Sequence, residues 1–264
     1  MNRKQIMISV LLLIAVLAKI GAQENAAAAN GSGSSASVPD NCKQISGSAV
    51  AAILSNSTFK ELSVRLDRDK SHLKIGDKQY YFKMAEQKIK KPGYDWKYFI
   101  NDINSFRHEL KFEKNSFYLF IEFEGNGSEI KGKCPGCVNA FEDRRAPDVD
   151  WEGKRRIKIK MKPVVYHQSI TFQVEKTEIE GKFELNGPMD VIMPTLNILE
   201  SLMKKMVETQ VKKFLGEASV KQKISEALKP VISQLGFTKI SKVYVAEEQL
   251  LVCGSAAQKV IIRN

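Results

Sequence analysis

Several segments of the chain alternate apolar and polar residues with the period of two that half-buried strands show. The clearest is 156–162, where Ile157, Ile159 and Met161 face one way and basic residues face the other. Similar alternation occurs at 62–66, 117–123 and 170–174, and Gly76-Asp77 predicts a hairpin between 73–75 and 79–84. Residues 179–185 are expected to extend or pair with the strand at 170–174, and 243–252 to form a closing hairpin or strand. The segments 88–98 and 130–151 lack this pattern and are expected to be a loop and an irregular stretch.

The period changes after Gly187-Pro188. From Met189 to Leu215 apolar residues recur every three or four positions, which predicts a long amphipathic helix ending at Gly216. A second helix is expected over 220–235, and a short one over 45–54. The resulting fold class is α+β, with helices packed on one face of a curved antiparallel sheet.

The N-terminus carries an export signal. Arg3 and Lys4 precede an apolar run from Ile6 to Ala18, and Ala22 stands before Gln23 as a cleavage residue, which is the pattern of a signal peptide over 1–22. The run is too short for a hydrocarbon core that needs roughly 20 residues. An uncleaved anchor is the alternative, and either interpretation places the protein outside the cytoplasm, periplasmic or secreted. A lipoprotein is rejected because no Cys follows the apolar run.

The rest of the chain divides into a linker and one body. Residues 23–41 are small and polar, with a run of four alanines followed by Gly and Ser, and we interpret them as a flexible linker. Residues 42–264 then form a single α+β domain, long enough to bury a core.

The charge favours anionic partners without selecting one. The formal net charge of +11 falls to +8 when Arg3, Lys4 and Lys19 leave with the signal peptide. Lipid head groups and acidic glycans are compatible with this balance. Export argues against nucleic acid, and an ordinary solvated basic surface explains the charge equally well.

The four cysteines, Cys42, Cys134, Cys137 and Cys253, predict disulfides in an oxidising compartment. A local Cys134–Cys137 bridge in a turn-rich loop leaves Cys42 to pair with Cys253. A thioredoxin-like redox pair and half a zinc site are the alternatives for the CxxC, but no strand-to-helix junction surrounds it and no histidine stands at ligand spacing.

Signatures of catalysis are missing from the sequence. There is no GxSxG elbow, glycine-rich phosphate loop, HExxH or cysteine with an evident histidine partner. We therefore expect a non-enzymatic protein without a cofactor or bound metal.

The helical stripe is rich in methionine, which packs adaptably against irregular apolar ligands and equally fills gaps in a core. The element order, with a strand from Ile170 to Leu185, a long helix through Ala227-Leu228-Lys229-Pro230 and a terminal strand from Lys242, resembles the tubular lipid-binding (TULIP) superfamily. It resembles most closely the small single-module bacterial exported members. The resemblance implies a curved sheet wrapped around a long helix, an apolar groove for acyl chains, and no catalytic residues. The groove candidates are Met161, Met189, Ile192, Met193, Leu196, Leu199, Met203 and Met206.

Four basic residues project together from one strand: Arg156, Lys158, Lys160 and Lys162. They are candidates for docking on an anionic membrane or meeting lipid head groups, and the polar outer face of a sheet is the plainer interpretation.

The leading hypothesis is an exported lipid-binding or carrier protein. The alternative is an exported envelope or surface protein that binds another protein or an acidic glycan.

Overall fold

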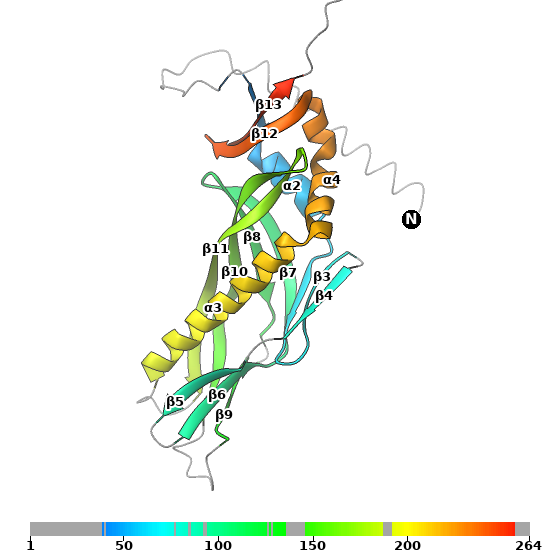
Figure 1. The fold of residues 1–264 in the computed structure, drawn as a ribbon. Helices are drawn as coiled ribbons and strands as arrows, with labels where there is room; N and C mark the ends of the chain where they lie inside the picture. The colour runs from blue at the N-terminus through cyan, green and yellow to red at the C-terminus, as the bar shows by residue number, and fades with distance from the viewer. Residues whose placement is uncertain are drawn as a thin grey trace, which may run out of the picture. The chain divides into compact units, whose positions relative to one another are not determined.

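Antiparallel strands make up most of the folded body (Figure 1). The computed structural model describes residues 39, 41–76, 78–83, 86–91, 94–125, 127, 129–135, 146–186 and 192–256. The predicted signal peptide and nearly all of the predicted linker lie outside these residues. The body itself, Pro39–Asn264, forms one unit.

The elements follow the alternation and periodicity of the sequence. In chain order they are β1 (Cys42–Ser46), α2 (Gly47–Asn56), β2 (Ser63–Leu66), β3 (Ser71–Ile75), β4 (Lys78–Phe82), β5 (Gln87–Lys91), β6 (Tyr94–Ile100), β7 (Ile103–Glu113), β8 (Ser116–Phe123), β9 (Ile130–Lys133), β10 (Asp148–Tyr166), β11 (Ser169–Asn186), α3 (Ile192–Gly216), α4 (Ala218–Gln234), β12 (Phe237–Ala246) and β13 (Gln249–Ala256).

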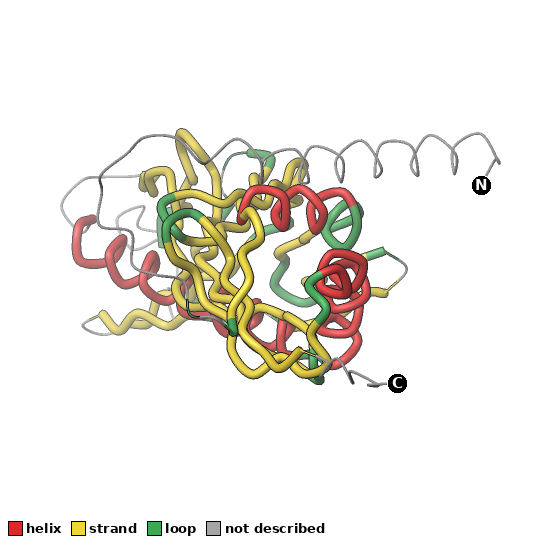
Figure 2. The backbone as a smooth tube through the Cα atoms, turned by 90° about the horizontal axis from the view of Figure 1, so that it is seen from above, coloured by secondary structure: helices red, strands yellow, loops and turns green. Residues whose placement is uncertain are grey.

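The larger sheet is organised around the long strand β10. Val149, near the start of β10, pairs with β9, while residues 156–161 pair with β8, and β11 runs beside β10 along its whole length. The sheet order is β4-β3-β2-β7-β8-β10-β9-β6-β5, and a separate sheet has the order β1-β13-β12. The fold is therefore α+β with a strongly curled antiparallel sheet, and Figure 2 shows the curl from above.

Irregularities in the β10–β11 pair accompany the curl. The register shifts between Glu152 and Arg156 and again between Lys160 and Met161, and such bulges bend a strand and increase its twist. The inner face buries the alternating apolar residues, including Ile157, Ile159 and Met161, as the sequence predicts.

The helices cover part of the sheet. The α2 helix begins at Gly47, two residues later than the predicted start. Ser46 caps it, because its side chain accepts a hydrogen bond from Ala49 N. The last turns of α3 are buried through Val211, Phe214 and Leu215. None of the helices in the described part of the chain is both long and apolar enough for a membrane span.

Two sequence predictions about irregular segments were wrong. In the segment 88–98, expected to be a loop, residues 88–91 belong to β5 and 94–98 to β6, and the two strands pair antiparallel from Gln87↔Tyr98 to Lys91↔Tyr94. The stretch 130–151, expected to be irregular, begins with β9 and ends within β10. The physical reason is that both segments bury one face, through Trp96 and Tyr98 in the first and Ile130, Val149 and Trp151 in the second.

The predicted disulfide between Cys42 and Cys253 is confirmed. The two residues stand opposite each other in the β1–β13 register, so the bridge ties the first strand of the body to its last. Cys134 is also disulfide-bonded, whereas Cys137 lies outside the described residues. The bridges are consistent with an oxidising compartment.

Candidate apolar binding cleft

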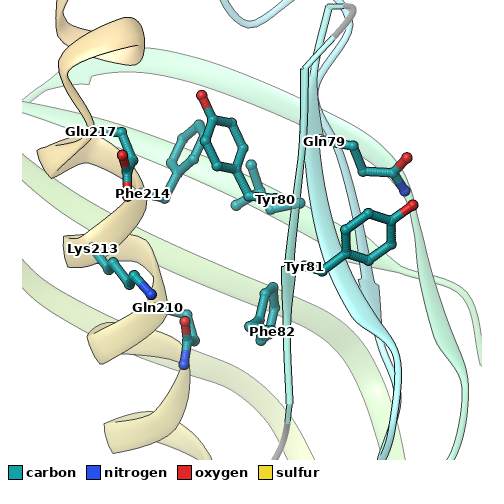
Figure 3. A pocket seen from close by; sticks show the side chains of 9 residues that line it. Gln79, Tyr80, Tyr81, Phe82, Gln210, Lys213, Phe214 and Glu217 are labelled. Atoms are coloured by element: carbon teal, nitrogen blue, oxygen red, sulfur yellow. The ribbon is translucent and has the colours of Figure 1, made fainter.

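A cleft opens between strand β4 and the C-terminal half of α3 (Figure 3). Its volume is about 270 Å³, close to the lower end of the range for small-molecule sites. The lining residues are Leu73, Gln79, Tyr80, Tyr81, Phe82, Gln210, Lys213, Phe214 and Glu217.

The alternation along β4 decides which side chains reach the cleft. Tyr80 and Phe82 point toward α3, whereas Gln79 and Tyr81 lie on the other side of the strand (Figure 3). Tyr80 packs edge-on against Phe214, with ring centroids 5.6 Å apart. Two elements far apart in sequence thus supply an aromatic wall, since offset and edge-on rings are the favoured arrangement.

A hydrogen bond fixes this wall in place. The Tyr80 hydroxyl lies 2.6 Å from Ser219 Oγ, in the first turn of α4. The bond satisfies the polar end of an otherwise apolar side chain and connects the β3–β4 hairpin to the helical segment. The cleft is therefore bounded by three elements whose positions are linked.

Below the cleft lies a small apolar void of about 20 Å³. Leu73, Phe82 and Gln210 line both spaces, so the cleft and the void are neighbours. The other residues around the void are Val64, Leu66, Ile121, Phe123, Ile157 and Val211. A void of this size is just large enough for one water molecule, but its surroundings offer water almost no polar partner.

The rim of the cleft is polar. Gln210 and Lys213 on α3, together with Glu217 at the N-cap of α4, supply an amide, a cation and an anion. An apolar floor with a few polar groups at the edge is the usual composition of a small-molecule site. This arrangement suits a ligand with an apolar body and one polar end.

Two further hollows differ from the cleft. One of about 270 Å³ lies on the other flank of α3, between Lys212, Leu215 and Lys221 on the helices and Phe172 to Val174 on β11. The other, about 670 Å³, is an open surface depression on the three-stranded sheet and includes Lys43, Phe237 and Lys239. The second is the largest, but it is shallow and lacks a continuous apolar lining.

Among the sequence-predicted groove residues, only Met161 has a side chain that the structure describes, and it is not one of the lining residues of the cleft. Met161 is buried on the inner face of β10. Ile192, Met193, Leu196, Leu199, Met203 and Met206 belong to α3, but the structure does not describe their side chains, and Met189 lies outside the described residues. The residues that sequence reasoning missed are Tyr80, Phe82 and Phe214. The alternation of 79–82 was a signal for the first two, and the end of the α3 stripe was a signal for the third.

The predicted basic face is largely paired with acids. Arg156 Nε donates to Glu180 at 2.8 Å, Lys158 Nζ lies 3.6 Å from Glu178, and Lys160 Nζ lies 2.8 Å from Glu175. The hydrogen bond to Glu175 raises the pKa of Lys160. Lys162 has no ion pair within the described part of the chain. A role for this face at a membrane stays a prediction.

One buried carboxylate has a structural explanation. Glu129 is fully buried and accepts hydrogen bonds from the backbone of Trp151 at 2.9 Å and of Gly127 at 3.2 Å. Arg155 lies 3.5 Å from the same carboxylate. These contacts hold a turn against β10, as expected for a buried charge that is paired and hydrogen-bonded.

Burial shifts the pKa of three further titratable groups. Burial lowers the pKa of His108, and burial followed by nearby Arg65 and Lys74 lowers that of His72. Burial, and then Asp148, raises the pKa of Tyr98. Among the described residues, no three His, Cys, Asp or Glu side chains gather as a metal site would require.

Comparison with protein-family models, with curated proteins and with solved structures gave no match for this chain.

Proposed function

We propose that the protein is an exported, non-enzymatic carrier that holds an acyl chain or a similar apolar ligand between its curled sheet and α3. The architecture we infer is TULIP-like, with the sheet wrapped partly around that helix. The observation that carries the proposal is the cleft at Tyr80, Phe82 and Phe214, which shares three lining residues with a small apolar void.

The cleft supplies affinity through burial alone. Apolar surface removed from water contributes about 25 cal/mol per Å², so an acyl segment held against Leu73, Phe82 and Phe214 needs no chemical step. The polar rim of Gln210, Lys213 and Glu217 would meet the head of such a ligand. Export is supported by the Cys42–Cys253 bridge.

The test is native mass spectrometry of the mature protein incubated with palmitate, compared with a variant whose cleft is filled. Gln210 lines both the cleft and the void, so Gln210→Trp places a large side chain in the ligand's path. We expect a one-to-one palmitate complex for the natural chain and at least a tenfold loss of affinity for Gln210→Trp.

The matched control is Thr209→Trp. Thr209 is the neighbouring residue on α3 and is exposed to solvent, away from the cleft lining. This variant should bind palmitate like the natural chain. An apo mass in every sample, or equal binding by both tryptophan variants, would overturn the proposal and favour a protein-binding or glycan-binding role.

A further inference from the structure

Three lysines stand in a row across the sheet at β5, β6 and β9. The register places Lys88 directly opposite Lys97, and Lys97 directly opposite Lys133. We call these three residues the lysine row. The three strands lie side by side at the end of the sheet away from α4 and β12 (Figure 1).

The lysine row lies on the outer face of the sheet. On β6 the alternate residues Trp96, Tyr98 and Ile100 are buried, so Lys97 between them points outward. Lys88 and Lys133 are exposed. Neighbouring strands are about 4.8 Å apart, so three cationic side chains leave the sheet within roughly 10 Å.

The side-by-side placement of the three lysines lowers the stability of the folded protein. Like charges directly opposite each other on neighbouring strands destabilise a sheet, whereas opposite charges stabilise it. In the β10–β11 pair Lys158 stands opposite Glu178 and Arg156 opposite Glu180. Where Lys160 stands opposite Lys176 in the same pair, each lysine has its own ion pair, with Glu175 and Glu178 respectively. Within the described residues, no member of the lysine row forms an ion pair.

Around the lysine row lie an aromatic ring and further basic residues that are matched by acids, among them Arg68, which lies 2.6 Å from Glu86. Phe99, the next outward residue on β6, has Lys133 Nζ 4.9 Å and the Arg68 guanidinium 5.0 Å from its ring centre. Lys90 also faces outward, opposite Asp95. Lys131 lies nearby but is bonded to Asp148 at 2.8 Å.

We propose that the lysine row is a docking surface for an anionic membrane. The proposal rests on the proposed carrier function, because an acyl-chain ligand resides in a lipid phase from which a carrier must collect it. The three lysines of the row project side by side from one face of the sheet. Each can therefore contact a different anionic head group of the same membrane surface. None of the hollows described above includes a member of the row.

The experiment measures sedimentation of the mature protein with vesicles of phosphatidylglycerol and phosphatidylcholine, or of phosphatidylcholine alone. The test variant is Lys88→Gln/Lys97→Gln/Lys133→Gln. Each lysine near an anionic surface contributes a favourable term, and removal of three should lower the partition coefficient about a hundredfold. Binding by the natural chain should also weaken as salt is raised.

The control variant, Lys60→Gln/Lys205→Gln/Lys229→Gln, removes the same charge from exposed positions elsewhere. It should keep most of the vesicle binding. The lysine-row variant should also melt at the same temperature or higher, since opposed like charges are removed, so that loss of binding is not caused by unfolding.

Several outcomes would overturn the docking surface. These are equal loss in both triple variants, equal binding to phosphatidylcholine alone, or binding to soluble heparin without binding to vesicles. Palmitate loading of the same samples separates the two proposals. If the protein binds palmitate but not vesicles, only the docking-surface proposal is overturned. If it binds vesicles but not palmitate, only the carrier proposal is overturned.

Discussion

Single residues explain how β10 and β11 pack around Trp151. The Trp151 side chain is fully buried, and its Nε1 donates to Glu180 O at 2.8 Å. Gly181 stands beside it with φ of +103°, and a Cβ there would lie 2.6 Å from Trp151 Nε1. The absence of a side chain at Gly181 is therefore what lets the indole lie against β11.

Gly181→Ala should lower the free energy of unfolding by about 2–4 kcal/mol, because it adds both a steric clash and an unfavourable φ. The measurement is a urea denaturation curve. Gly216→Ala is the control, since a Cβ at that position meets nothing within 4 Å and a helix prefers Ala to Gly. Equal stability of the Gly181 variant and the natural chain would contradict the packing argument.

At the scale of elements, three hairpins turn through two residues with positive φ and without glycine. They are Lys114-Asn115, His167-Gln168 and Glu247-Glu248. Positive φ at both positions is the type I′ turn, which glycine and asparagine favour. In the first of these turns the Asn115 side chain accepts from Glu248 N at 2.6 Å, so two of the turns are joined.

Gln168→Gly should raise the free energy of unfolding by about 0.5–1 kcal/mol, because Gln168 has φ of +60° and glycine adopts this region without strain. Thermal and urea unfolding measure the change. Asn115→Gly is the informative comparison: it relieves the same strain but loses the bond to Glu248 N. We expect its gain to be smaller than that of Gln168→Gly, and the reverse order would contradict this interpretation.

The elements were predictable from sequence where one face alternates clearly. Residues 157–161 and 170–174 carry that pattern, and both are strands. The hairpin of β5 and β6 was missed because Pro92-Gly93 and the surrounding lysines resemble a loop, although Trp96, Tyr98 and Ile100 already alternate with polar or outward residues. The lysine row could not be predicted, since it depends on the missed pairing of β5 with β6 and on the register between β6 and β9, which are distant in sequence.

At the scale of the whole molecule, the cleft could not be predicted from sequence because its residues come from elements that only the fold brings together. Tyr80 of the cleft packs against Phe214 and bonds to Ser219, and only the fold places β4 beside the α3–α4 junction. The methionine stripe indicated an apolar helix face but not which strand would oppose it. The Cys42–Cys253 pairing, by contrast, was predictable because a tight loop favours Cys134 pairing with Cys137 and leaves one remaining combination.

That pairing leads to a prediction for the whole body. The bridge joins residues separated by 211 positions and lies in the three-stranded sheet, where Ile45, Leu250 and Val252 contribute to the core. A bridge that closes so long a loop restricts the unfolded chain strongly. Cys42→Ser/Cys253→Ser should therefore lower the free energy of unfolding by about 2–5 kcal/mol.

The loss should reach beyond the three-stranded sheet, because β12 of that sheet packs near β10 of the larger one. Urea unfolding followed by tryptophan fluorescence reports on the larger sheet, since Trp96 and Trp151 are buried there. If the bridge supports the whole body, fluorescence and far-UV circular dichroism will shift together to lower urea in the serine variant. A circular dichroism change at lower urea than the fluorescence change would instead mean that the three-stranded sheet unfolds separately and that the bridge stabilises only that part.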